Sequence, residues 1–243
     1  MNNPIELKNV FKSYPSYQNN EKFINALTDI NLTIKENSIT LISGANGSGK
    51  SVLMNIIAGL EKPSKGTVKT TSKPGLIFQD ANIQILGDTV YEDVCIGPKN
   101  QKKSKSEVDI IVKNALRDVS LYDKSNNLSE FLSGGEKRRL ATASIISMNR
   151  NILIFDEPYA NLDYPSVVDV NNLIKKLHNQ GKTIIILTHE LEKIMGLSTH
   201  FVVLFKGHKV FDGSPENAFN ENLENWGIKN PLTSYKNIKD LVW

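Results

Sequence analysis

The chain has 243 residues, 40% of them hydrophobic, which is enough for one large α/β domain or two small ones with a sizeable core. A charged fraction of 23% and a formal net charge of +3 lack the strong basic bias of a dedicated nucleic-acid-binding protein, so no nucleic-acid partner is expected. Because Cys95 is the single cysteine, an intrachain disulfide and a cysteine-based metal site are excluded, which favours a reducing compartment such as the cytosol.

Strands are predicted for most of the segment before residue 44. The stretches IELKNVFKSY, INLTIK and SITLIS either alternate apolar and polar residues or are short and rich in β-branched residues. The last of them leads into the glycine-rich sequence GANGSGKS at 44–51, and KSVLMNIIAGL at 50–60 has apolar residues at helical spacing. This order predicts a strand, a glycine loop and a helix.

A helical region is predicted further along the chain, after a short strand LIFQ at 76–79. Strand signals are absent from about 82–148, and SEVDIIVKNALRDVSL has clear helical periodicity. We interpret this region as an α-helical subdomain inserted into a domain that spans 1–220.

Two short and almost wholly apolar runs, NILIFDEP and KTIIILTHE, are typical of strands buried on both faces of a parallel sheet. The stretch SVVDVNNLIKKLHNQG between them predicts an amphipathic helix. FVVLFKGHKVFDGSP predicts a hairpin with its turn near Gly207, and the polar tail at 221–243 has no assignable pattern or role. These apolar runs are far shorter than the roughly twenty residues that span a bilayer, so no membrane-spanning segment is expected.

The glycine loop matches the phosphate-binding pattern G-x-x-x-x-G-K-[ST]. Gly44, Gly47 and Gly49 permit positive φ, which lets successive backbone N–H groups converge on phosphates. Lys50 then places an ammonium group at the β- and γ-phosphates, and the hydroxyl of Ser51 can ligate Mg²⁺. The predicted ligand is therefore a nucleoside triphosphate with Mg²⁺.

Polar side chains follow three of the predicted strands, at the sheet edge where α/β proteins bind ligands. Asp156 can hold the Mg²⁺ water shell, and Glu157 can orient or deprotonate an attacking water. His189 can hydrogen-bond the γ-phosphate and hold that water with Glu157. The neutral amide of Gln79 can contact the metal or the water, although glutamine is also common at strand ends without such a role.

Five motifs in order carry a resemblance to a known family: GANGSGKS, LSGGE at 132–136, ILIFDE, ANLD at 160–163, and His189. Together they resemble the ATPase cassette of the ABC superfamily over about residues 5–219. The resemblance implies an α/β P-loop NTPase fold that binds and hydrolyses ATP. The fold would have a mainly parallel core sheet, an N-terminal antiparallel β-subdomain and an inserted α-helical subdomain.

The resemblance also implies a role for LSGGE that differs from that of the glycine loop. In the family this motif closes over the ATP of a second, head-to-tail cassette, so Ser133, Gly134 and Gly135 would address the partner's γ-phosphate. A helix starting near Glu136 would add its partial positive end. The second cassette can be an identical chain or a paralogue.

By the same match Tyr14 resembles the aromatic residue that stacks on adenine, although aromatic residues in strands more often belong to the core. Asp163 resembles the residue that reaches across the dimer. The expected catalytic residues are Glu157, His189 and Lys50, and the expected metal ligands are Ser51, Gln79 and Asp156. The expected nucleotide-binding residues are Tyr14, Gly44, Asn46, Gly47, Ser48, Gly49, Lys50, Ser51, Val52, Gln79, Ser133, Gly134, Gly135 and Asp163. Three positions depart from the usual family residues without removing a phosphate, metal or water contact: Val52 and Tyr159 for threonine, and Glu136 for glutamine.

The segment FQDANIQILGDTVYEDVCIGPKN at 78–100 is similar to the corresponding segment of the ATPases of energy-coupling-factor importers, although Ala81 replaces a usual proline. The similarity implies a peripheral subunit on the cytoplasmic face of the membrane. Its partners would be an integral membrane scaffold, which docks short helices near Gln84 and Val90, and a membrane component that binds the substrate. The alternative is a soluble single-cassette ATPase such as that of iron–sulfur cluster assembly.

Overall fold

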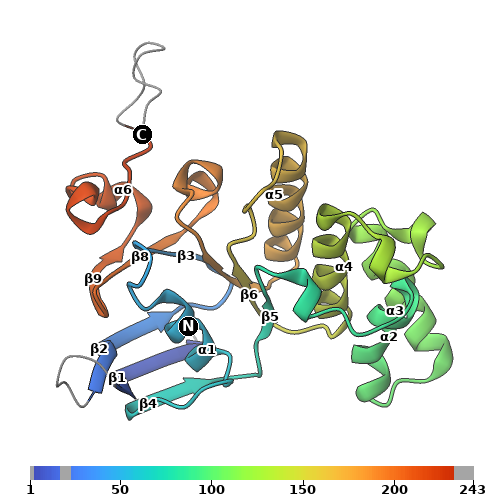
Figure 1. Ribbon diagram of the computed structural model, residues 1–243, viewed down its shortest axis with the longest axis horizontal. Coiled ribbons are helices and arrows are strands. Elements are labelled where there is room, and N and C mark those ends of the chain that lie inside the picture. Colours follow the sequence, from blue (N-terminus) through green and yellow to red (C-terminus); the bar gives the residue numbers. More distant parts are fainter. Residues whose placement is uncertain (1–2, 17–22, 233–243) are drawn as a thin grey trace.

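The structure is a computed structural model that describes residues 3–16 and 23–232. It has two sheets, a three-stranded one in the order β2-β1-β4 and a six-stranded one in the order β5-β6-β7-β3-β8-β9. Figure 1 shows the three-stranded sheet at one end of the molecule and helices α2, α3 and α4 at the other, with β5, β6 and α5 between them. The predicted fold class is confirmed.

The six-stranded sheet holds the predicted buried strands. Its members are β3 (Ile39–Ser43), β5 (Gly75–Ile77), β6 (Ile152–Asp156), β7 (Thr183–Leu187), β8 (His200–Phe205) and β9 (His208–Gly213). All neighbours are parallel except β8 and β9, whose hairpin turn contains Gly207 at φ +79°, as predicted. Because parallel strands end at the same edge, the segments after β3, β5, β6 and β7 meet there.

The three-stranded sheet is antiparallel and consists of β1 (Ile5–Pro15), β2 (Phe23–Ile34) and β4 (Lys65–Thr70). Strand β4 is not predicted from the sequence, because KGTVKT has Val68 as its single large apolar side chain; almost all of its residues are exposed. Strand β4 pairs with β1 alone, so it forms an edge that needs no buried pattern.

Helix α1 (Lys50–Ile57) follows the glycine loop, and α5 (Tyr164–Asn179) connects β6 to β7. The region predicted to be helical contains α2 (Val90–Asn100), α3 (Lys105–Asp118) and α4 (Gly134–Ser147). These three helices form a small apolar core of their own, with Val94, Val112 and Leu140 fully buried at its centre.

The described part of the predicted tail packs on the domain. After the short helix α6 (Pro215–Ala218), Leu223 and Ile228 are 1% and 4% exposed and lie in the same core as α5 and β8. Residues 233–243 of that tail lie outside the described residues. Of the helices in 3–16 and 23–232, none is long and apolar enough to cross a membrane.

Candidate nucleotide site

The glycine loop between β3 and α1 has the backbone conformation that the sequence predicts. Gly44, Gly47 and Gly49 have φ values of +151°, +78° and +103°. A Cβ on Gly44 would lie 2.1 Å from the carbonyl oxygen of Leu204, and one on Gly49 would lie 2.7 Å from that of Ala26. These two glycines are therefore required both by φ and by the close backbone approach.

Lys50 opens helix α1 and is 9% exposed. Its Nζ donates to the carbonyl oxygen of Gly44 at 2.6 Å and to that of Ala45 at 3.2 Å. Burial lowers the pKa of Lys50, and the nearby carboxylates of Glu157 and Asp156 oppose that shift. The ammonium group thus lies between the glycine loop and the end of β6.

The other predicted residues of the loop lie around the start of α1. Asn46 and Ser51 are exposed and Val52 is half-buried. Ser48 is 2% exposed, and its Oγ has no hydrogen-bond partner in the part of the chain that the structure describes. The first turn of α1 contains no acidic residue, so its N-terminal N–H groups face the loop without a neutralising carboxylate. A helix start of this kind binds anions.

Two carboxylates end strand β6. Burial, reinforced by the neighbouring charge of Glu157, raises the pKa of Asp156 to about 6. Glu157 has φ +45°, and its backbone N–H donates to the carbonyl oxygen of Leu187 at 2.8 Å. This unusual conformation turns the chain at the sheet edge immediately after the strand.

The structure brings Glu157 and His189 together, in line with their predicted cooperation. Oε1 of Glu157 lies 3.0 Å from Nδ1 of His189, which follows the next strand, β7. The other carboxylate oxygen, Oε2, is buried without a hydrogen-bond partner among the described residues. A buried acceptor in this state is suited to receive a proton or a hydrogen bond from a substrate.

Gln79 is exposed after β5, beside the end of β6. Arg138, for which the sequence predicts no role, lies nearby. Its guanidinium donates to the carbonyl oxygens of Gln79, Pro158 and Ala160 at 3.2, 3.3 and 2.5 Å. Its acceptors are backbone atoms, so no side-chain pairing in the sequence indicates this contact.

Helix α4 begins at Gly134, two residues before the predicted start at Glu136. Ser133 is its N-cap and forms a capping box with Glu136, whose pKa is lowered to about 2 by an ion pair with Lys124 and by the cap hydrogen bonds. Gly134 and Gly135 line a cavity of ≈ 550 Å³ together with Gln79 and Asp156, and no residue of 44–51 is among the described residues that line it.

Tyr14 and Asp163 have local partners. The hydroxyl of Tyr14 donates to Oε1 of Glu61 at 2.7 Å, and burial with this hydrogen bond raises the pKa of Tyr14 to about 12. Asp163 is the N-cap of α5, where Oδ1 accepts from the N–H of Ser166 at 3.1 Å. The predicted adenine contact and the predicted contact across a dimer stay predictions.

The side chains of the two residues near which docking is predicted, Gln84 and Val90, are engaged within the chain. Val90 is 0% exposed, and Gln84 is held by the N–H of Phe78 at 3.0 Å and the carbonyl oxygen of Leu76 at 3.2 Å. The predicted docking of a scaffold near these two residues stays a prediction. The exposed apolar side chains there are Ile83 and Leu86, at 65% and 76%.

Comparison with known proteins shows the family of the chain. The family model for the ABC transporter matches residues 27–160. The chain is 36% identical over 251 residues to the energy-coupling factor transporter ATP-binding protein EcfA2 of Clostridium tetani, covering 95% of this chain and 86% of the relative. The chain therefore belongs to the ABC transporter family. Within that family it belongs to the energy-coupling factor transporter ATP-binding proteins.

Solved structures agree with this assignment. The fold is similar to cbiO1 from Clostridium perfringens, which is part of the ABC transporter complex cbiONQ, with a TM-score of 0.79, 30% identity and coverage of 91% of this chain and 92% of that one. It is also similar to a dimeric post-hydrolysis state of the ATP-binding cassette MJ0796 bound to ADP and Pi. That similarity has a TM-score of 0.77 and 30% identity, and it covers 87% of this chain and 98% of the other.

Proposed function

We propose that the chain binds and hydrolyses ATP as the energising subunit of an importer of the energy-coupling-factor type. The observation that carries this proposal is the convergence at one sheet edge. Lys50 lies between the glycine loop and the carboxylates of β6, and Glu157 is paired with His189 while one of its oxygens is left without a partner.

The chemistry follows from these positions. The N–H groups of the glycine loop and the ammonium of Lys50 bind the phosphates, and the start of α1 adds its partial positive charge. Glu157 accepts a proton from the attacking water, whose oxygen forms the new bond to the γ-phosphorus as the bond to the leaving ADP oxygen breaks. His189 hydrogen-bonds Glu157 and the γ-phosphate, and it thereby fixes their positions relative to each other.

The residues present also fit Mg²⁺. Ser51, Asp156 and Gln79 offer oxygen ligands, and the described residues contain no group of three His, Cys, Asp or Glu side chains that could hold a metal ion by themselves. This suits Mg²⁺, which takes much of its shell from water and substrate phosphates. Bound there, the ion would neutralise charge that develops on the phosphates.

The cassette acts in a head-to-tail pair, identical or paralogous. Gly134 and Gly135 have no positive φ, and a Cβ on either would meet nothing within 4 Å. Nothing in the described part of the chain therefore requires glycine in the first turn of α4, where it weakens a helix. A partner's nucleotide that approaches the backbone closely would require it.

The pair docks at the cytoplasmic face of the membrane on an integral scaffold, next to a membrane component that binds the transported substrate. The exposed Ile83 and Leu86 supply the apolar contact. The soluble alternative, an ATPase of iron–sulfur cluster assembly, is not favoured, because relatives that match most of the chain are transporter ATP-binding proteins.

The decisive experiment is Glu157→Gln. The variant should bind ATP with unchanged affinity, lose at least about 100-fold in kcat, and accumulate as an ATP-bound dimer in size-exclusion chromatography. The matched control is Glu216→Gln at an exposed position of α6, which should behave as wild type. Wild-type turnover in the Glu157 variant, or the lack of an ATP-dependent dimer, would refute the proposed mechanism.

A further inference from the structure

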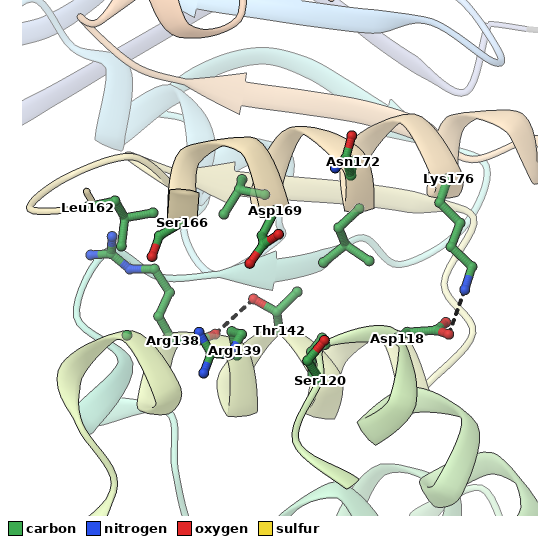
Figure 2. Close-up of a pocket in the computed structure, with 14 residues that line it drawn as sticks. Asp118, Ser120, Arg138, Arg139, Thr142, Leu162, Ser166, Asp169, Asn172 and Lys176 are labelled. Carbon is green, nitrogen blue, oxygen red and sulfur yellow. Dashed lines mark hydrogen bonds and ion pairs between the residues drawn. The ribbon is translucent and has the colours of Figure 1, made fainter. Parts of the chain in front are cut away.

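Arg138 joins three parts of the site that are distant in sequence. It lies in the first half of α4, the helix whose N-cap is Ser133. Its guanidinium donates to Pro158 and Ala160, in the segment that directly follows Glu157, and to the backbone of Gln79. Figure 2 shows the Arg138 side chain extending from α4 towards Leu162, in the segment before α5.

The segment after Glu157 has few other hydrogen bonds to hold it. Within it the backbone N–H of Ala160 donates to Glu157 at 3.3 Å and that of Leu162 to Tyr159 at 3.2 Å, both long for such bonds. The hydroxyl of Tyr159 anchors one point of the segment on Asn171 of α5. The 2.5 Å hydrogen bond from Arg138 to the carbonyl oxygen of Ala160 is therefore the main contact between this segment and the helical region.

The shape of the side chain matters as much as its charge. A guanidinium carries several N–H donors in a fixed plane, so Nη1 and Nη2 can bind two different loops at once. A lysine ammonium carries its three donors on one atom and lacks this fixed, planar fork, so it fits an arrangement of carbonyl oxygens from two loops less well. The geometry therefore favours arginine over lysine.

We propose that Arg138 is a positioning residue for ATP hydrolysis, which fixes the backbone after Glu157 and the backbone of Gln79 to helix α4. This inference rests on the proposed function. The helix that presents Ser133 and Gly134 to the partner's nucleotide then also sets the place of the hydrolytic carboxylate in its own chain. Arg138 acts on the chemical step, after nucleotide binding and dimer formation.

The test separates these steps in the full chain. Arg138→Gln should lower kcat at least about tenfold, while the affinity for ATP, measured by equilibrium binding, stays at the wild-type value. Arg138→Lys should also have a lowered kcat. If a thermal melt shows that the glutamine variant is unfolded, the lysine variant provides the test.

A double variant tests the dimer. In the Glu157→Gln background, adding Arg138→Gln should leave the ATP-dependent dimer intact. The matched control is Arg117→Gln, an exposed arginine of α3 that packs on the ring of Tyr122, and it should change none of these values.

Wild-type kcat in a folded Arg138 variant would overturn the proposal. Loss of the dimer in the double variant would overturn it as well, because Arg138 would then act on the dimer surface rather than on Glu157. If Glu157→Gln alone forms no ATP-dependent dimer, the proposed function fails instead. A fall in kcat at unchanged ATP affinity would still support the role of Arg138 in that case.

Discussion

Asp156 illustrates, at the scale of single residues, how a partly buried carboxylate lowers the stability of the fold. Its carboxyl group is half-buried beside Glu157, and desolvation with the neighbouring charge of Glu157 raises its pKa from 3.8 to about 6. Because the folded chain binds this proton more tightly than the unfolded chain, the group lowers stability as the pH rises from about 4 through 6. The penalty is fully present at neutral pH.

Asp156→Asn should therefore stabilise the metal-free and nucleotide-free protein. At pH 8 we expect a gain of about 1–2 kcal/mol in the free energy of unfolding, after allowance for solvent screening and for the charge that Lys50 loses. The gain should shrink towards zero as the pH is lowered to about 4. Urea unfolding at several pH values measures it, with the exposed Asp169→Asn as control. A gain independent of pH would contradict this explanation.

The single residues that the sequence predicts well are those fixed by the backbone. Gly44, Gly47 and Gly49 have the positive φ that their motif requires, and Glu157 meets His189 because parallel strands end at one edge. Arg138 could not be found in this way. Its acceptors are carbonyl oxygens that every residue carries, so only the folded arrangement identifies them.

Helix α4 shows the same limit at the scale of an element. The sequence predicts the helix, but it places the start near Glu136, two residues after the observed start at Gly134. Ser133 and Glu136 match the S-x-x-E pattern of a capping box, and this signal would have given the correct start. The edge strand β4 had no comparable signal, since its residues are mostly exposed.

The variant Gly134→Ala separates the effect of this glycine on helix stability from its effect on ATP turnover. Alanine fits the open space and the helical φ, so we expect the isolated chain to gain up to about 1 kcal/mol in its free energy of unfolding. ATP turnover should nevertheless fall at least about tenfold, because a methyl group would separate the helix start from the partner's phosphate. Thermal melting and steady-state hydrolysis measure the two effects.

Gly196 provides the matched control for this variant. A Cβ there also meets nothing within 4 Å, and Gly196 is not among the residues with positive φ. Gly196→Ala should leave turnover unchanged. If Gly134→Ala keeps full turnover as well, the glycines of α4 do not contact a nucleotide.

At the scale of the whole molecule, the proposed function requires that ATP hydrolysis at the sheet edge be coupled to the proposed membrane scaffold. The sequence predicts a docking segment around residues 78–100, but it does not tell which side chains point outward. In the structure, Asp93 fixes the direction of these side chains, and it is only 2% exposed. Its carboxylate accepts from the N–H groups of Leu86 and Gly87 at 2.7 and 2.9 Å and from the hydroxyl of Ser144 at 2.5 Å. It ties the loop to α4, so the exposed Leu86 is held in a fixed position.

A double variant, Ile83→Ser with Leu86→Ser, tests that surface. Burying two such side chains against a scaffold should contribute about 3 kcal/mol, so we expect recovery of the chain with solubilised membranes to fall at least about tenfold. The affinity of the purified chain for ATP should not change, because neither residue belongs to the glycine loop. Ile110→Ser on α3, 60% exposed in the same helical region, is the control and should be recovered like wild type. Equal losses in both variants would mean that general surface apolarity, rather than the loop held by Asp93, binds the membrane partner.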